Sequence, residues 1–379
     1  MSELIPDLFR SEYRKIVAVL CKRYGIAQIE IAEDLAGDTF LAAAESWGVQ
    51  GIPAHPTAWL YTVAKNRAKN YLKRDAVFEG KVAPELKRAT EGANPERADA
   101  EEEFDLSPQN ITDSQLQMMF AVCHPAISPE SQIGLALRIL CGFSIEEIAA
   151  AFLTNKETIN KRLFRAKERL REIQIQLEMP GPSEIDERLD AVQRTIYLLF
   201  NEGYYSASQD RSLRRDLCYE AIRLCHMLIE YGPADTPATN ALMALMCFHA
   251  SRFDARQDNV LYDQQDPGLW NTDWISKGGY FLQRASGGDQ LSKYHLEAGI
   301  AYWNTQKEDT KEKWERILQL YDLLLQVEYS PMAALNRAFA LSKVNGPAEA
   351  IAEAERLKLE DNPYYWMLLE ALRSRSPGQ

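Results

Sequence analysis

The chain has 379 residues, a formal net charge of -12 and 46% hydrophobic residues. That length exceeds one ordinary hydrophobic core, so we expect two or three domains. Apolar runs stay well below the roughly 20 residues that a bilayer crossing requires, and the start MSELIPDLFRSEYRK is acidic where a signal peptide is basic. We therefore expect a cytoplasmic protein with no membrane contact.

The negative charge is spread unevenly along the chain. Residues 1–180 hold 22 Lys and Arg against 26 Asp and Glu, whereas the remainder holds 21 against 29. A negative total opposes long-range attraction to nucleic acid. Two cationic stripes in the first half nevertheless make a nucleic-acid partner plausible.

Cysteine usage indicates core thiols rather than a metal site. The cysteines lie in apolar helical patterns without a CxxC pair, which predicts reduced, buried side chains. His124, His226 and His249 each lie near a cysteine, but the spacing does not bring four zinc ligands together. We expect no metal and no cofactor.

The first 75 residues have the periodicity of three helices. Apolar residues recur at three- and four-residue steps over 4–24 and again over 29–47, where Gly48 is expected to close the helix. Thr57 is expected to cap a third helix that runs to Asp75. Residues 76–112 then lose this periodicity, and 91–113 holds eight acids and one base, so we expect a flexible acidic linker.

Helical patterns resume at Asp113 and continue almost to the end of the chain. Residues 128–172 predict three helices with short joints, MPGPSE at 179–184 interrupts them, and 184–375 shows no period-two strand signal. Within 335–372 the pattern resembles a tetratricopeptide unit, with small residues for helix contact and Gly346 in the turn. The sequence thus predicts an all-α fold with a repeat-like helical domain at its end.

Residues 144–171 predict a helix-turn-helix. An apolar helix, a turn at about Leu153 to Asn155 and a basic helix follow one another, and Lys156 to Arg171 holds seven bases and two acids. Ile159, Leu163, Ala166 and Leu170 take the inward face. The outward residues, which we expect to contact phosphates and base edges in the major groove, are Lys156, Thr158, Asn160, Lys161, Arg162 and Arg165. The alternative interpretation is a solvated basic helix without a DNA contact. A helix cap at Thr154 or Asn155 favours the helix-turn-helix over this alternative.

A second cationic stripe occupies the third helix. Cations can follow a backbone while aromatic rings stack on unpaired bases, as proteins that hold an opened strand do. The candidate residues are Trp59, Lys65, Asn66, Arg67, Asn70, Tyr71, Lys73 and Arg74. In the alternative interpretation Trp59, Leu60 and Val63 are core residues and the cations are merely solvated.

The helix before it combines acids with apolar residues. Asp34 and Asp38 lie beside Leu35, Thr39 and Phe40, and acidic residues next to exposed apolar surface suit a protein partner better than DNA. An ordinary surface helix would have the same composition, so this segment alone does not decide.

The order of these parts resembles a known family. DLAGDTF, GIPAHPTAWLYTVAKNRAKNYLKRD, an acidic linker and SIEEIAAAFLTNKETINKRLFRAKERLR together resemble a sigma factor of the extracytoplasmic-function (ECF) group. RLDAVQRTIYLLFNEGYYSAS, DQQDPGLWNTDWI and SPMAALNRAFALSKVNGPAEAI resemble the subset with a tetratricopeptide-like extension. The resemblance implies sigma domain 2 in 1–75, linker 76–112, sigma domain 4 in 113–178 and the extension in 184–375.

The resemblance also implies partners and roles. Core RNA polymerase would be bound through its clamp helices by Asp34, Leu35, Asp38, Thr39 and Phe40. The stripe from Trp59 to Arg74 would recognise and melt the -10 element, and the helix beginning at Lys156 would read the -35 element. Both double-stranded and melted promoter DNA would thus be bound, without an enzymatic activity.

Two features of the extension allow more than one interpretation. Residues 196–208 could bind a ligand, touch the sigma domains within the same chain, or form a polar helix end. Asp263, Asp266 and Asp273 lie near Trp270 and Trp274 without a nucleophile or phosphate loop, so we interpret them as caps and buried anchors.

The sequence also leaves two alternative functions and one regulatory hypothesis to consider. The alternatives are a helix-turn-helix regulator with a helical-repeat sensor domain and an enzyme in the extension, for which no catalytic set is found. The acidic linker and extension could also compete with DNA for the cationic stripes.

Overall fold

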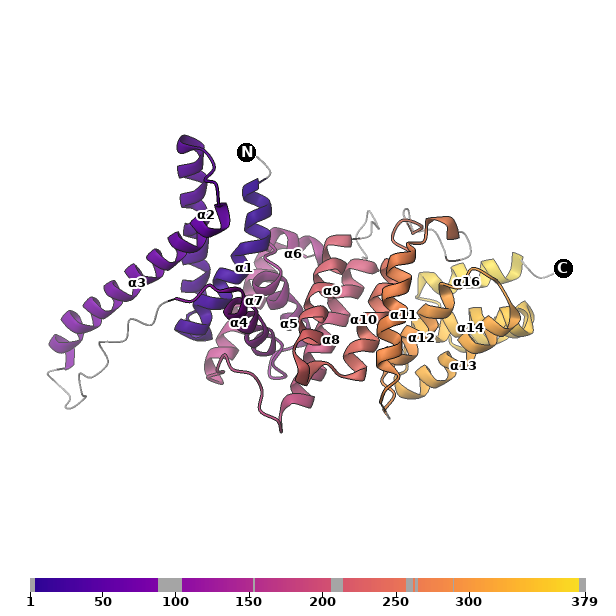
Figure 1. Ribbon diagram of the computed structural model, residues 1–379. Helices are drawn as coiled ribbons and strands as arrows, with labels where there is room; N and C mark the ends of the chain where they lie inside the picture. The colour runs from indigo at the N-terminus through magenta and orange to yellow at the C-terminus, as the bar shows by residue number, and fades with distance from the viewer. Residues whose placement is uncertain are drawn as a thin grey trace. The chain divides into compact units, whose positions relative to one another are not determined.

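A computed structural model describes residues 4–87, 104–152, 154–205, 214–256, 262, 265–288 and 290–374, with backbone alone for 75–87 and 363. Every regular element in the described residues is a helix, without strands, as expected (Figure 1). The chain divides into two compact units, residues 1–195 and 196–379.

Unit 1 begins with three helices and continues with four shorter ones. The helices are α1 (Leu4–Tyr24), α2 (Ile29–Gln50), α3 (Pro56–Lys87), α4 (Pro108–Val122), α5 (Pro129–Leu135), α6 (Ile145–Ala151) and α7 (Lys156–Glu172), with a 3-10 turn η1 (Ile26–Gln28) and a π-helical turn η2 (Ala136–Leu140). Helix α8 (Ile185–Tyr204) begins in unit 1 and ends in unit 2.

The core of unit 1 joins its early and late helices. Ile16, Trp47 and Leu60 of the first three helices are at most 2% exposed, and α1 also contacts α4. The first turns of α8 belong here too, because Arg188 donates to the Phe120 carbonyl at 2.6 Å and Thr195 donates to Gln132 at 3.2 Å. The sequence predicts that the extension begins at residue 184, so these turns are its first residues in the chain.

Helix α2 ends later than the sequence suggested. Gly48 continues the helix, and Gly51 terminates it with a φ of 83°, a conformation that costs a non-glycine residue strain. Helix α3 likewise begins at Pro56, so Thr57 lies inside it and is not its cap.

The helical segments also reach into the expected linker. Helix α3 continues past Asp75 to Lys87, and α4 begins at Pro108 behind an N-cap at Ser107 rather than at Asp113. Most of the strongly acidic stretch, residues 88–103, lies outside the described residues.

The helix-turn-helix segment is fixed by its caps. Ser144 and Glu147 form a reciprocal capping box at the start of α6, and the Asn155 side chain caps α7 by accepting from the Thr158 amide at 2.8 Å. The four inward residues expected for α7 are all buried. Asn155, not Thr154, is therefore the cap, while Leu153 lies outside the described residues.

Unit 2 continues from α8 with further helices. They are α9 (Arg215–Glu230), α10 (Pro237–Ala250), α11 (Thr272–Ala285), α12 (Lys293–Asn304), α13 (Lys311–Val327), α14 (Pro331–Asn345), α15 (Pro347–Arg356) and α16 (Pro363–Ser374), with 3-10 turns η3 (Gly232–Ala234) and η6 (Pro267–Leu269).

Close packing and caps hold these helices. A Cβ at Gly278 of α11 would approach Phe248 of α10 to 2.5 Å, so the two helices pack through a glycine. Gly346 joins α14 and α15 with a φ of 96°, as expected for the turn.

All the cysteines are buried thiols, as their apolar surroundings predicted: Cys21, Cys123, Cys141, Cys218, Cys225 and Cys247. No helix in the described residues has the length and apolar character to cross a membrane.

Candidate nucleic-acid interface

Helix α3 presents a polar stripe to solvent. Asn66, Asn70, Lys73 and Arg74 are exposed and recur at three- and four-residue steps, so they share one helix face. None of the four has a side-chain hydrogen bond or ion pair with the rest of the described chain. Amide and cationic groups are thus available on this face, and Lys69, which is also exposed, adds a further cation.

The other candidates on α3 are engaged within unit 1. Trp59 is half-buried with its ring edge-on to Trp47 at 5.3 Å, and Tyr71 lies edge-on to Tyr24 at 5.7 Å. Arg67 forms an ion pair with Asp38 of α2 at 3.2 Å, and Lys65 is half-buried. The expected stacking of these aromatics on bases therefore competes with their own packing.

Helix α7 presents a second exposed polar face. Asn160, Lys161 and Arg165 are exposed, and within the described residues no side chain binds them. Lys156 pairs with Glu146 of α6 at 2.7 Å, and Arg162 lies over the Phe152 ring at 5.4 Å. Thr158 is exposed at the first turn, where its amide is already capped by Asn155.

The far end of α7 is bound by the acids of α2. Glu33 accepts from Lys167 at 2.5 Å and from Arg138 at 2.9 Å, and only 11% of the Glu33 side chain is exposed. Arg171 pairs with Glu30 and donates to the Ala27 carbonyl at 2.8 Å. These contacts could not be predicted from local sequence patterns, because the paired residues lie more than 100 positions apart.

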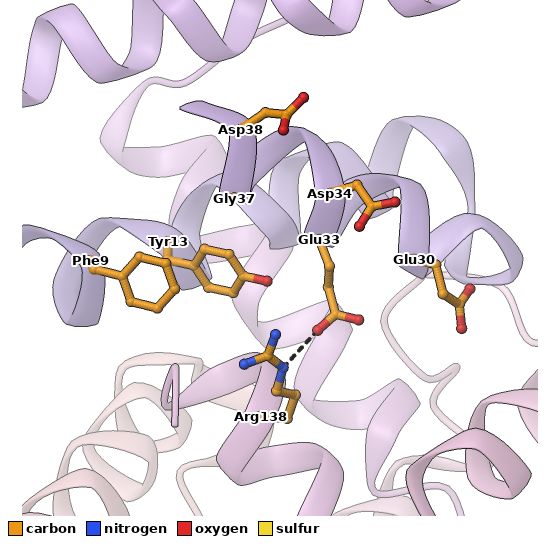
Figure 2. Close-up of a pocket in the computed structure, with 8 residues that line it drawn as sticks. All are labelled: Phe9, Tyr13, Glu30, Glu33, Asp34, Gly37, Asp38 and Arg138. Carbon is orange, nitrogen blue, oxygen red and sulfur yellow. Dashed lines mark hydrogen bonds and ion pairs between the residues drawn. The ribbon is translucent and has the colours of Figure 1, made fainter. Parts of the chain in front are cut away.

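An open pocket of about 560 Å³ lies beside this ion-pair network (Figure 2). Glu33 turns towards Arg138 on its floor, whereas Asp34 and Asp38 turn away. The two aspartates are exposed and remain accessible to a partner. Burial and the negative charge of Glu33 raise the pKa of the lining Tyr13 well above its usual range, so its hydroxyl stays protonated.

The apolar candidates on α2 are not on the surface. Leu35, Thr39 and Phe40 are 7%, 0% and 5% exposed, so the apolar surface expected beside the aspartates does not exist in this conformation. Phe40 packs against Phe9 at 5.1 Å, and the Thr39 hydroxyl donates to the Leu35 carbonyl at 2.8 Å. Periodicity could have revealed this, because all three residues continue the inward stripe of α2.

The segments singled out in the extension behave mainly as caps and anchors. Asp266 accepts from the Gly268 amide at 2.8 Å, and Trp270 is 6% exposed. Asp273 is exposed in the first turn of α11, and Trp274 is half-buried. Asp263 lies outside the described residues. Within the described ranges, no His, Cys, Asp and Glu side chains gather as metal ligands would.

Three family models match the chain. Sigma-70 region 2 matches residues 8–77, and Sigma-70, region 4 matches residues 118–170. A family of unknown function, DUF6596, matches residues 188–286. The two regions with exposed cationic faces thus coincide with two sigma-70 regions.

Curated relatives cover either most of the chain or its first half. The uncharacterized protein R00370 of Rhizobium meliloti is 33% identical over 343 residues, 89% of this chain and 80% of its own. The ECF RNA polymerase sigma-E factor of Escherichia coli K12 is 32% identical over 166 residues, 43% of this chain and 82% of its own. RNA polymerase sigma factor YlaC of Bacillus subtilis is 29% identical over 165 residues, 43% of this chain and 87% of its own. No solved structure matches the chain.

Proposed function

Because the chain belongs to the sigma-70 family, in the ECF group of sigma factors that act in transcription initiation, we propose that its exposed cationic helix faces read the promoter. As a sigma factor it is not an enzyme. The match to region 2 favours this function over a helix-turn-helix regulator with a sensor domain, since such a regulator needs region 4 alone.

The observation that carries the proposal is the unpaired polar face of α7. Asn160, Lys161 and Arg165 are exposed on a capped helix whose opposite face is buried. In a helix-turn-helix this second helix enters the major groove, where Asn can bind adenine and Lys or Arg can bind guanine or phosphate. We assign this face to the -35 element, with Lys156, Thr158 and Arg162 at its margins.

The exposed stripe of α3 is assigned to the -10 element. Asn66 and Asn70 offer amides that can hydrogen-bond unpaired base edges, while Lys73 and Arg74 hold the backbone. Trp59 and Tyr71 can contribute a ring to an unpaired base only after leaving Trp47 and Tyr24. The amides therefore carry more of the proposed role than the sequence suggested.

The acidic surface of α2 is assigned to core RNA polymerase. Asp34 and Asp38 are exposed and can bind cationic side chains of the clamp helices. Leu35, Thr39 and Phe40 support the helix from inside. Asp38 must also release Arg67 to bind a new partner, since the two form an ion pair.

The helices of unit 2 are proposed to be tetratricopeptide-like. Ala338 and Ala350 are completely buried where α14 and α15 pack together, and Gly346 supplies the turn. These features support a repeat-like helical layer.

Run-off transcription with bacterial core polymerase tests the assignment. Promoters would first be selected from a random DNA library with core polymerase and this protein. We expect Arg165→Ala and Asn160→Ala to relax selection at -35, and Asn66→Ala with Asn70→Ala to reduce opening at -10, reported by 2-aminopurine fluorescence. Each lost base contact should cost about 1–3 kcal/mol.

Lys311→Ala serves as the matched control, because Lys311 is an exposed cation of unit 2. It should leave transcription unchanged. The proposal fails if the protein does not start transcription with core polymerase, or if the α3 and α7 variants select the same promoters and open them as well as the unchanged protein does.

A further inference from the structure

Two arginines in unit 2 have no carboxylate partner among the described residues, unlike other enclosed arginines of this unit. Arg215 pairs with Asp254, Arg284 with Asp235, and Arg337 with both Asp322 and Glu353. Arg252 is only 6% exposed and Arg256 is half-buried, yet within the described residues neither has an acidic partner. An uncompensated buried cation costs several kcal/mol in general, so its retention needs a reason.

Aromatic and neutral groups surround the two guanidinium groups. Arg256 lies over the Tyr204 ring at 3.9 Å and over the Tyr205 ring at 4.8 Å. Arg252 lies over the Tyr262 ring at 5.6 Å. These faces attract cations but do not neutralise them.

His249 completes the cluster without adding a negative charge. One Arg252 terminal nitrogen lies 3.2 Å from His249 Nδ1 and 3.5 Å from the Tyr204 hydroxyl. Burial, together with the charges of Arg252 and Arg256, holds the pKa of His249 well below its usual range, so the ring is neutral and can accept this hydrogen bond.

One donor in the cluster is left without a partner. Arg252 Nε is buried and makes no hydrogen bond to any described residue, whereas buried polar atoms in proteins are almost always satisfied. Tyr205 is 53% exposed and lies just beyond the end of α8, so it forms the solvent side of the cluster.

We propose that Arg252 and Arg256, with Tyr204, Tyr205 and His249, form a binding site for the carboxylate or phosphate group of a small molecule. The group would supply the missing negative charge, and the planar forks of two guanidinium groups suit the oxygens of either anion. Its approach is past Tyr205, since Arg252 itself is almost fully enclosed. A small ligand fits better than a protein surface, because only a terminal group can reach an arginine that is 6% exposed.

The full-length protein can be tested with inorganic phosphate and with succinate, each compared with chloride at equal ionic strength. We expect one of the two to raise the melting temperature and to give a saturable heat of binding by calorimetry. A response to phosphate assigns the site to phosphorylated ligands, and a response to succinate assigns it to carboxylates. Equal melting temperatures in all three salts, with no heat of binding, would overturn the proposal.

Substitutions locate the effect. Arg256→Met and Arg252→Met should each weaken binding of the responding anion at least tenfold, whereas Arg316→Met, at an exposed arginine of α13, should not. Arg252→Met should also raise the melting temperature of the ligand-free protein, because it removes a buried charge that no acid among the described residues compensates. Binding that survives both cluster substitutions, or an Arg252→Met protein that is folded but melts at a lower temperature, contradicts the assignment.

Discussion

At the scale of single residues, burial decides whether an ionisable side chain is charged. Glu297 of α12 is half-buried and accepts a hydrogen bond from the Tyr197 hydroxyl at 3.0 Å. Burial raises the pKa of Glu297 to about 7, although Tyr197 and Lys293 oppose the shift. A glutamate in a sequence therefore does not reveal its own protonation state.

The raised pKa of Glu297 predicts a pH-dependent stability. Between its ordinary pKa of 4.5 and about 7, the folded protein retains a proton that the unfolded chain has released. The free energy of unfolding should therefore fall as pH rises through this window. Glu297→Gln removes this loss and keeps an acceptor for Tyr197, so it should stabilise the protein by about 2 kcal/mol at pH 8 and little at pH 5.

Urea unfolding at both pH values measures this difference. Glu315→Gln, at an exposed glutamate of α13, is the control and should have the same stability as the unchanged protein at both pH values. A Glu297→Gln protein with the same stability as the unchanged protein at pH 8 would contradict the assignment.

At the scale of elements, the helices themselves were predictable but their ends and mutual contacts were not. The inward stripe of α7 and its basic outer face follow from a 3.6-residue period, and the structure buries the same four apolar residues. In the sequence, Gly48 and Gly51 are equally good candidates for the end of α2. Only their backbone torsion angles in the structure distinguish them. The pairing of Glu33 with Arg138 and Lys167 depends on tertiary packing that local sequence does not encode.

The different roles of Gly48 and Gly51 can be tested by the same substitution. Gly48→Ala lies inside α2 with open space around a new Cβ, so it should stabilise the protein by about 0.5–1 kcal/mol. Gly51→Ala also meets no neighbour, but its φ of 83° and ψ of 165° should cost roughly 1–3 kcal/mol. Chemical unfolding of the two variants should thus give opposite signs, and equal effects would contradict the α2 boundary.

The ion pairs between α2 and α7 should contribute to the stability of unit 1. Glu33→Gln removes the negative charge that pairs with the cations of Arg138 and Lys167. The Glu33 side chain is only 11% exposed, so water can replace that charge only in part. We expect a loss of about 1–3 kcal/mol, below the full cost of breaking a buried pair, because Glu30 lies 3.7 Å from Lys167. Glu45→Gln, on the exposed face of the same helix, should change the free energy of unfolding by less than about 0.5 kcal/mol. Similar losses of unfolding free energy in both variants would show that the ion pairs between α2 and α7 do not stabilise unit 1.

At the scale of the whole molecule, a strongly acidic chain has to bind an acidic polymer. The net charge is -12, and the proposed promoter contacts come from a few cations on α3 and α7. Long-range attraction to DNA is therefore weak, and docking on core polymerase is expected to bring these helices to the promoter. The segment Glu91–Asp105 concentrates further negative charge between the two helices in the chain, and its acids can compete with DNA phosphates for the same cations.

Neutralising part of this segment tests the competition. Glu101, Glu102 and Glu103 lie outside the described residues, and their joint replacement by Gln should increase the affinity of the free protein for promoter DNA at about 0.05 M salt. The gain should shrink at 0.2 M salt, because the screening length falls below about 10 Å. A matched control replaces Glu308, Glu312 and Glu315, three exposed acids of unit 2, with Gln and changes the net charge equally. Fluorescence anisotropy on a selected promoter should show a gain for the linker variant alone. The same gain in affinity in both variants would assign the effect to total charge. No gain in either variant would contradict competition between the linker and DNA. Weak DNA binding by the free protein would then have to come from the small number of exposed cations.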